Sequence, residues 1–281
     1  MVASNQPDNI TVIDGRLPSW ARYGRDLYAY REVARVLIHR DLIVRFRQAF
    51  FGIAWLLFKP LMMMLVISLA FGLISRFESQ TAAPYPLVVL CGVIPWYFLS
   101  NAIPDGMNSI VSHLHILQKT YFPRIIIPLV AVAINVIEFI TAWLLFALAC
   151  AWYGFIPGWQ VAVLPFFLLL AVALGTGLSL WLSMLHARFR DVGNLIPFLI
   201  SIAFFVTPIG YTLASVPERW RHFFLLNPVA GIVEGIRWSL LGGTFPPPLS
   251  ALASATAIVL ATLVSGLWFF RRNESTIVDM G

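Results

Sequence analysis

The sequence predicts an all-α integral membrane protein with six transmembrane helices, an N-terminal amphipathic interface helix and re-entrant outer helices before the last span. Apolar residues make up 59% of the 281 residues and charged residues only 11%, far from the composition of a soluble domain. They gather in runs of roughly 20 residues, the length that crosses a bilayer core as a helix. Cys91 and Cys150 fall inside such runs, so neither a disulfide framework nor a metal site is expected.

Three regions are expected: a cytoplasmic N-terminus at 1–50, a transmembrane domain at 51–270 and a short cytoplasmic tail at 271–281. The N-terminal region has no apolar core followed by a cleavage site, so no cleaved signal peptide is expected. From Leu27 to Arg47, apolar residues recur at helical spacing and basic residues take the other face. This pattern indicates a basic amphipathic helix, which either lies in the membrane interface or packs on the protein's own cytoplasmic face.

The six expected spans are 51–74, 86–108, 125–152, 161–185, 192–211 and 249–270. In the first span, Pro60 should kink the helix and Lys59 should snorkel toward the inner boundary. The second span contains Pro95 and Pro104, which are tolerated where other helices or a water-filled path cover them. We expect Asp105 to lie at the inner interface without a special role.

Glu138, in the third span, is the most deeply placed acid of the chain. An ionisable group at this depth indicates a functional site. A structural role, as partner of Lys59, an Asn side chain or a backbone group, is the alternative. The fourth span carries small residues that permit close helix packing, namely Gly175, Thr176, Gly177 and Ser179.

Lys and Arg residues concentrate before the first span, in the loops after the second and fourth spans, and after the last span. The positive-inside rule therefore places both termini in the cytoplasm. Membrane orientation accounts for the pI of about 9.7, so membrane lipids are expected as partners and nucleic acid is not.

Two polar segments interrupt the apolar pattern. Residues 110–123 form a weakly basic cytoplasmic segment, which we call the coupling segment and interpret as the place where a soluble partner pushes; an ordinary hydrophilic turn is the alternative. Residues 213–243 alternate charged and short apolar stretches that are too short to span. Two amphipathic helices that dip into the outer leaflet and turn at Asn227–Pro228 fit this pattern, and a folded outer loop is the alternative.

The chain lacks the chemistry of a motor or a soluble hydrolase. Neither Lys59 nor Lys119 stands in a phosphate-binding loop. No cofactor is therefore expected on this chain, and it is not expected to be an enzyme. The spans do contain many aromatic side chains, which stack on sugar faces and would suit a saccharide path; lipid-facing or core positions are the alternative for most of them.

Four stretches in order resemble one family. They are RDLIVRFRQAFFGIAWLLFKPL, QKTYFPRIIIPL, ARFRDVGNLIPF and LLNPVAGIVEGIRWSLLG. With the six-span layout in the same order, the match as a whole is spread from about Arg40 to Arg272. Together they are similar to the type-two ABC export permeases of polysaccharides and O-antigens. The resemblance implies a homodimer of permeases with two copies of a separate ATPase subunit that carries ATP and Mg²⁺. Six helices are also too few to enclose a channel for a sugar chain, which favours a dimer independently.

The resemblance also implies roles for particular residues. It makes the coupling segment the helix that docks on the ATPase, with His113, His115, Leu117, Gln118, Lys119 and Tyr121 as its candidates. Candidates for the substrate path are Arg45, Arg47, Trp55, Lys59, Trp96, Tyr97, Phe204 and Phe205. Candidates for the outer gate are Pro217, Trp220, Asn227, Pro228, Glu234 and Arg237.

The implied substrate is a lipid-linked polysaccharide that moves outward across a bacterial inner membrane. O-antigen on undecaprenyl diphosphate is the first expectation, and capsule and teichoic-acid exporters are close relatives. Arg45, Arg47 and Lys59 could meet a diphosphate headgroup.

Two alternatives of other classes stay open. One is an integral membrane glycolipid enzyme using Glu138, Asp105, or His222 with Glu234. The other is an ion-coupled carrier, for which Glu138 and Lys59 are the available charges.

Overall fold

The computed structural model describes residues 20–47, 52–74, 83–117, 122–242 and 249–274. The described residues form helices and connecting turns, with no strand among them. The helices are α1 (Trp20–Ala29), α2 (Arg31–Arg47), α3 (Trp55–Ile74), α4 (Tyr85–Ser112), α5 (Leu114–Leu117), α6 (Ile126–Tyr153), α7 (Leu164–Arg188), α8 (Val192–Val206), α9 (Glu218–Leu225), α10 (Pro228–Leu241) and α11 (Leu249–Asn273). Short 3-10 turns occupy Gly52–Ala54, Trp159–Val163 and Leu213–Ser215.

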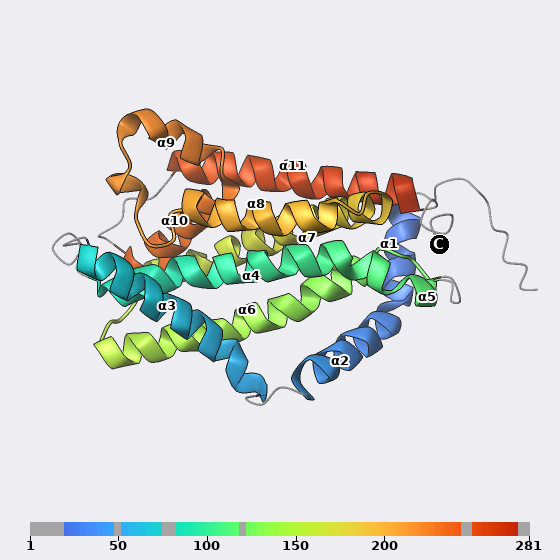
Figure 1. The fold of residues 1–281 in the computed structure, drawn as a ribbon, viewed down its shortest axis with the longest axis horizontal. Helices are drawn as coiled ribbons and strands as arrows, with labels where there is room; N and C mark the ends of the chain where they lie inside the picture. Colours follow the sequence, from blue (N-terminus) through green and yellow to red (C-terminus); the bar gives the residue numbers. More distant parts are fainter. Residues whose placement is uncertain (1–19, 48–51, 75–82, 118–121, 243–248, 275–281) are drawn as a thin grey trace, which may run out of the picture.

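The long helices run side by side along one axis (Figure 1). Among the described residues, four helices are long and apolar enough to cross a membrane: α4, α6, α11 and the continuous stretch Trp159–Arg188 that contains α7. The apolar parts of α3 and α8 are shorter, Trp55–Ala70 and Val192–Val206. The chain is therefore a multi-pass membrane protein, and α8 ends five residues before the expected boundary at 211 because Thr207 is extended and Pro208 follows.

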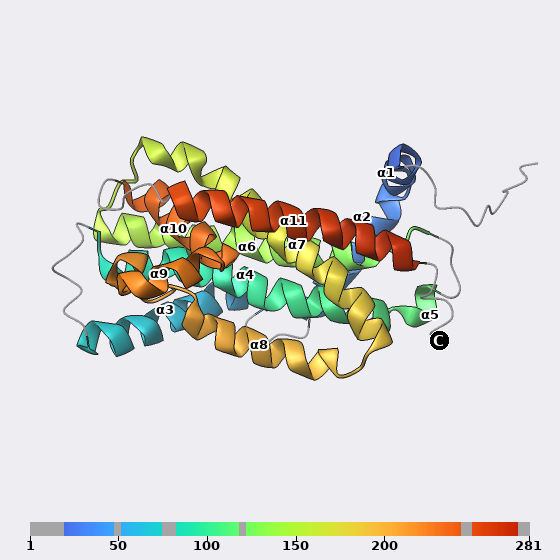
Figure 2. The ribbon, with the colours of Figure 1, turned by 90° about the horizontal axis from the view of Figure 1, so that it is seen from above.

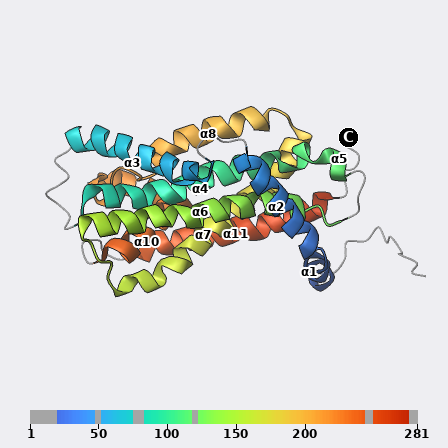
Figure 3. The same ribbon diagram turned by 90° about the horizontal axis from the view of Figure 1, so that it is seen from below.

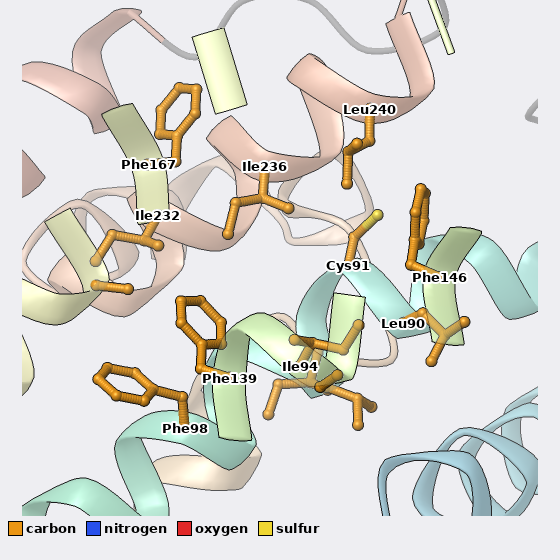
Figure 4. Close-up of a cluster of buried hydrophobic side chains, with 14 of the residues drawn as sticks. Leu90, Cys91, Ile94, Phe98, Phe139, Phe146, Phe167, Ile232, Ile236 and Leu240 are labelled. Atoms are coloured by element: carbon orange, nitrogen blue, oxygen red, sulfur yellow. The ribbon is translucent and has the colours of Figure 1, made fainter. Parts of the chain in front are cut away.

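Helix α4 is the core of the bundle. Within its apolar window 72% of the residues are buried, against 17% for α11. Pro95 and Pro104 lie inside it without ending it, because α6, α7, α3 and α10 pack around it. Figure 4 shows Leu90, Ile94 and Phe98 of α4 in one cluster with side chains of α6, α7 and α10.

Helices α7 and α11 approach so closely that only glycine fits at their crossing. A Cβ on Gly177 would lie 2.9 Å from the Leu263 backbone, and a Cβ on Gly266 would lie 2.6 Å from the Gly177 carbonyl oxygen. This confirms the packing role predicted for Gly177.

The two ends of the bundle differ. One end carries α1, α5 and the last turn of α11, and the other carries α9 and α10 (Figures 1 and 2). A second apolar cluster holds the first end together; it includes Leu37, Ile110, Leu117, Phe122, Ile126, Leu180 and Phe270. It joins α2, α4, α5, α6, α7 and α11 at the end that contains the coupling segment.

Helix α2 crosses the outside of the bundle against α6 (Figure 3). Leu37 is buried, and Val33, Ile38 and Leu42 pack around it. This agrees with the alternative that the helix packs on the protein itself. Exposed apolar side chains, Val36 and Val44 among them, leave a membrane interface role as a prediction.

The outer region does form two helices that meet at Leu226–Asn227. The Asn227 side chain caps α10 by accepting a hydrogen bond of 3.0 Å from the Val229 amide. The prediction that both helices are amphipathic is wrong for α10. Every residue from Ala230 to Leu241 except Trp238 is buried, because α10 inserts between α4, α7 and α11.

Candidate functional site

A pocket of about 200 Å³ lies where α2 ends and α3 begins, beside α4 and α6. We call it the inner pocket; its lining is Arg45, Phe46, Gly52, Trp55, Leu56, Lys59, Tyr97 and Glu138. Figure 1 shows α2 running from one end of the bundle to its middle, where α3 starts. Glu138 also stands near the middle of the 28-residue α6, so the pocket lies well inside the length of the bundle.

Arg45 is the centre of a charged network at this pocket. Its Nε lies 2.9 Å from Glu138 Oε1, and one of its terminal nitrogens lies 3.2 Å from Asp105 Oδ2. Asn135 donates a 2.8 Å hydrogen bond to the same Asp105 oxygen. Glu138 is only 11% exposed at its side chain, so Arg45 compensates a carboxylate that is nearly out of solvent.

Lys59 contributes a second cation, held by aromatic rings. Its Nζ lies 6.0 Å from the Trp55 ring centroid and 5.9 Å from the Tyr97 ring centroid, at the outer limit of cation–π attraction. Lys59 forms no ion pair within the part of the chain that the structure describes. The pocket thus offers an ammonium group and two ring faces to a ligand.

The structure brings together four of the predicted path residues: Arg45, Trp55, Lys59 and Tyr97 line one pocket. Arg47 is exposed at the end of α2 and is not part of the lining.

Trp96 instead packs against Phe204, with 5.7 Å between the two ring centroids. Phe205, next to Phe204, is 77% exposed. These three aromatics form a separate group on the α4–α8 side.

At the coupling end, α4 stops at His113 and the short α5 follows. Arg40 of α2 donates to His113 Nε2 at 3.0 Å, and His113 Nδ1 donates to the Ser109 carbonyl at 2.9 Å. Arg40 also pairs with Asp41 at 2.8 Å. The start of the coupling segment is therefore fastened to α2.

The other residues predicted to contact the ATPase differ in their exposure. Leu117 is buried in the apolar cluster of this end, whereas His115 is exposed. Gln118, Lys119 and Tyr121 lie outside the described residues.

At the opposite end, Arg237 forms what we call the outer knot. The side chain is fully buried, and its guanidinium donates to the carbonyls of Val88 at 3.3 Å, Tyr211 at 2.8 Å and Ile209 at 2.6 Å. It also pairs with Glu234 at 2.9 Å. One side chain of α10 thereby fixes the segment after α8 against α4.

Further hydrogen bonds and a glycine support the knot. Tyr85 donates to the Gly210 carbonyl at 2.7 Å, and Asn227 donates to Thr207 Oγ1 at 3.1 Å. A Cβ on Gly92 would lie 2.9 Å from the Ile209 backbone, so only glycine lets this segment approach α4.

The predicted gate residues therefore separate into two groups. Asn227, Pro228, Glu234 and Arg237 belong to α10 and its cap, whereas Pro217 and Trp220 are exposed at α9.

Comparison with known proteins places this architecture in a family. The sequence model of the family described as ABC-2 type transporter matches residues 32–241, which is more than half of the chain. The chain belongs to the ABC-2 type transporter family.

Named relatives of this ABC-2 chain match over nearly their whole length. An O-antigen export system permease protein RfbA of Myxococcus xanthus is 28% identical over 90% of this chain and 97% of the relative. A protein of the same name from Klebsiella pneumoniae is 26% identical over 87% and 93%. The polysialic acid transport protein KpsM of Escherichia coli is 23% identical over 88% and 97%.

Sequence reasoning missed part of the ABC-2 chain's inner pocket. Asp105 was expected to lack a special role, but it binds both Arg45 and Asn135. Glu138 was predicted to mark a functional site, with a structural pairing to Lys59, an Asn or the backbone as the alternative; its ion-pair partner is Arg45, which neither prediction named. The depth of Glu138 in its span was enough to predict that this residue belongs to a site. Its pairing with Arg45 could not be predicted, because the sequence did not say where α2 lies along the bundle.

Proposed function

We propose that this chain is the membrane permease subunit of an ATP-driven exporter of lipid-linked polysaccharide. The cargo moves from the cytoplasmic to the outer side of a bacterial inner membrane, and O-antigen linked to undecaprenyl diphosphate is the first candidate. Two copies of the chain work with two copies of a separate ATPase, which binds ATP and Mg²⁺. Both termini lie in the cytoplasm, as the distribution of Lys and Arg favours.

The observation that carries the proposal is the inner pocket in a chain whose relatives are named for O-antigen export and polysialic acid transport. Lys59 and Arg45 offer charged donors to a diphosphate. The Trp55 and Tyr97 rings offer flat apolar faces to a sugar. A lipid-linked glycan contains both chemical groups next to each other, which supports this cargo over a simple ion.

The contacts of the coupling segment support the proposal that a separate ATPase drives transport. The segment joins two long helices, its start is fastened to α2, and Leu117 anchors it in the apolar cluster of that end. A push on this segment by a soluble ATPase would therefore reach several helices at once. A capsule or teichoic-acid polymer is the alternative cargo of the same machine.

Reconstitution tests the proposal. The chain and its ATPase are placed in vesicles that contain lipid-linked O-antigen, and the glycan that becomes accessible on the opposite face is measured with ATP and with a non-hydrolysable analogue. ATP-dependent appearance of the glycan is the expected result. Export that continues without hydrolysis would reject the proposal. So would an ATPase activity that does not respond to the glycan, together with unchanged surface polymer in cells from which this chain has been deleted.

The same system separates the other classes. A membrane enzyme predicts chemical turnover of the glycolipid without ATP, lost in Glu138→Gln. The carboxylates of Glu138 and Asp105 are both paired with Arg45. This pairing disfavours their action as a catalytic carboxylate pair. An ion-coupled carrier predicts that export stops when the proton gradient is collapsed at constant ATP.

A further inference from the structure

The end of α11 is tied by one residue, Glu274, both to α1 and to the residue that directly follows the coupling segment. The Glu274 carboxylate accepts a hydrogen bond of 2.9 Å from the Tyr23 hydroxyl of α1 and one of 2.7 Å from the Arg124 amide. The Arg124 guanidinium also donates to the Glu274 carbonyl oxygen. The three residues are separated by 251 and 150 positions in sequence, and we call them the C-terminal clamp.

One turn before Glu274, Arg271 strengthens the same junction. It is buried, and its guanidinium carbon lies 4.1 Å from the Trp20 ring centroid and 5.3 Å from the Tyr23 ring centroid. Burial raises the pKa of the Tyr23 hydroxyl, and the nearby Glu274 raises it further. Tyr23 therefore remains a hydrogen-bond donor throughout the physiological range.

The clamp lies where the coupling segment returns to the bundle. The segment starts at α4 with His113 fastened to α2, and it ends at Phe122 and Pro123, directly before Arg124. Helix α11 then runs along α7 and reaches α10 and α9 at the far end of the molecule. A continuous helix thus connects the exit of the coupling segment with the elements around the outer knot.

We propose that Glu274 is a positioning residue that makes α11 move with the coupling segment, so that the ATPase stroke reaches the outer helices through α11 as well as through α4 and α6. The inference rests on the proposed function, because it assumes that an ATPase engages the coupling segment. Removing the carboxylate breaks its hydrogen bonds to the Tyr23 hydroxyl and to the Arg124 amide, and so loosens the coupling segment from α11. The Arg124 guanidinium keeps the Glu274 backbone carbonyl, and the apolar cluster remains.

Spin labels test the link directly. His115→Cys and Arg272→Cys introduce labels at exposed positions on the coupling segment and on α11, while both native cysteines are buried. In the complete complex with its ATPase, the label distance is measured without nucleotide and with ATP and vanadate. The distance stays constant in the parent protein and changes with nucleotide in Glu274→Ala. A distance that changes equally in both proteins overturns the proposal.

Transport supplies the second measurement. Tyr23→Phe lowers the amount of glycan exported per ATP hydrolysed by roughly tenfold for the loss of one charge-assisted hydrogen bond, and Glu274→Ala lowers it at least as much. ATPase activity, complex assembly and melting temperature stay near the parent values. The double variant is no worse than Glu274→Ala alone, because Glu274→Ala already removes the acceptor of the Tyr23 hydroxyl.

The matched control is Glu32→Gln, which neutralises an exposed carboxylate on the same end that pairs with Arg35. It leaves the export ratio unchanged. A Glu274 variant that exports normally per ATP rejects the clamp, whereas a parent complex that hydrolyses ATP without moving glycan rejects the proposed function instead.

Discussion

At the scale of single residues, paired charges mark two places in this molecule, one at an end of the bundle and one near its middle. Arg237 and Glu234 are buried in the outer knot, and the partly exposed Arg45 meets the nearly buried Glu138 in the inner pocket. A charged side chain inside a membrane protein is costly unless it is paired and hydrogen-bonded. Both arginines meet this condition by joining elements that are distant in sequence, so each determines how helices sit relative to one another.

Loss of Arg237 should destabilise the fold. Arg237→Met leaves Glu234 without its cation and removes the guanidinium donor from three carbonyls, and breaking a buried pair in this way costs about 3–5 kcal/mol. The melting temperature of the purified protein in nanodiscs measures the effect. Arg219→Met on the exposed helix α9 is the control. Equal melting temperatures for both variants would show that the knot contributes little.

Arg45 and Arg47 provide a matched pair for the inner pocket. Arg45→Gln leaves the carboxylates of Glu138 and Asp105 without their cation, so ATP-driven export should fall by about tenfold or more, the effect of one charged contact. Arg47→Gln should export normally because Arg47 does not line the pocket. Initial export rates in vesicles measure both. Similar losses in the two variants would indicate a general effect of basic charge near the membrane.

At the scale of helices, close packing and loose packing coexist. Helices α7 and α11 touch backbone to backbone at Gly177 and Gly266. In contrast, none of residues 192–206 of α8 is buried by its own chain, and α8 is fixed chiefly at its outer end by the knot. Contact between α7 and α11 therefore belongs to the rigid part of the molecule, and α8 to the part that can shift or bind a partner.

A side chain at the α7–α11 crossing should separate the helices. Gly177→Ala places a Cβ 2.9 Å from backbone atoms of α11 that cannot move aside, and such overpacking costs about 1–3 kcal/mol. Thermal unfolding should show a lower midpoint. Gly24→Ala, with nothing within 4 Å of the new Cβ, should unfold at or above the parent midpoint, because Ala favours the helix more than Gly does. An unchanged midpoint for Gly177→Ala would contradict the close approach.

At the scale of the whole molecule, one chain is too small to enclose a sugar path. The inner pocket, at about 200 Å³, has room for a headgroup-sized ligand but no polymer. The polysaccharide path that we propose therefore includes a second copy of the chain, as in the proposed exporter. The apolar and aromatic surface of α8, where Phe198 is 61% exposed and Phe205 is 77% exposed, is the face we expect to meet that copy.

Cross-linking tests this arrangement. Phe198→Cys on α8 should give a cross-linked dimer with a short bifunctional thiol reagent in native membranes, because we expect the two copies to meet through α8. Leu148→Cys, on an equally exposed face of α6 (61%), should give no cross-linked dimer, because we expect this face to meet lipid. Dimers from Leu148→Cys alone would move the interface to α6.

The sequence by itself determined the class of the molecule, the approximate position of its apolar helices and the two polar interruptions. These features depend on local composition: a run of about 20 apolar residues must be buried in lipid or protein wherever it lies. Gly177 could also be predicted, because small residues in a span permit close packing. The order of four short stretches pointed to the ABC-2 family.

Only the tertiary structure decided which charges meet. Arg45 reaches Glu138 because α2 crosses α6, and Arg237 reaches Ile209 because α10 inserts into the bundle. Glu274 reaches Tyr23 because α1 and the last turns of α11 share one apolar cluster. Each contact joins residues far apart in the chain. No periodicity or spacing encodes such a pair, since its partners are brought together by the packing of whole helices.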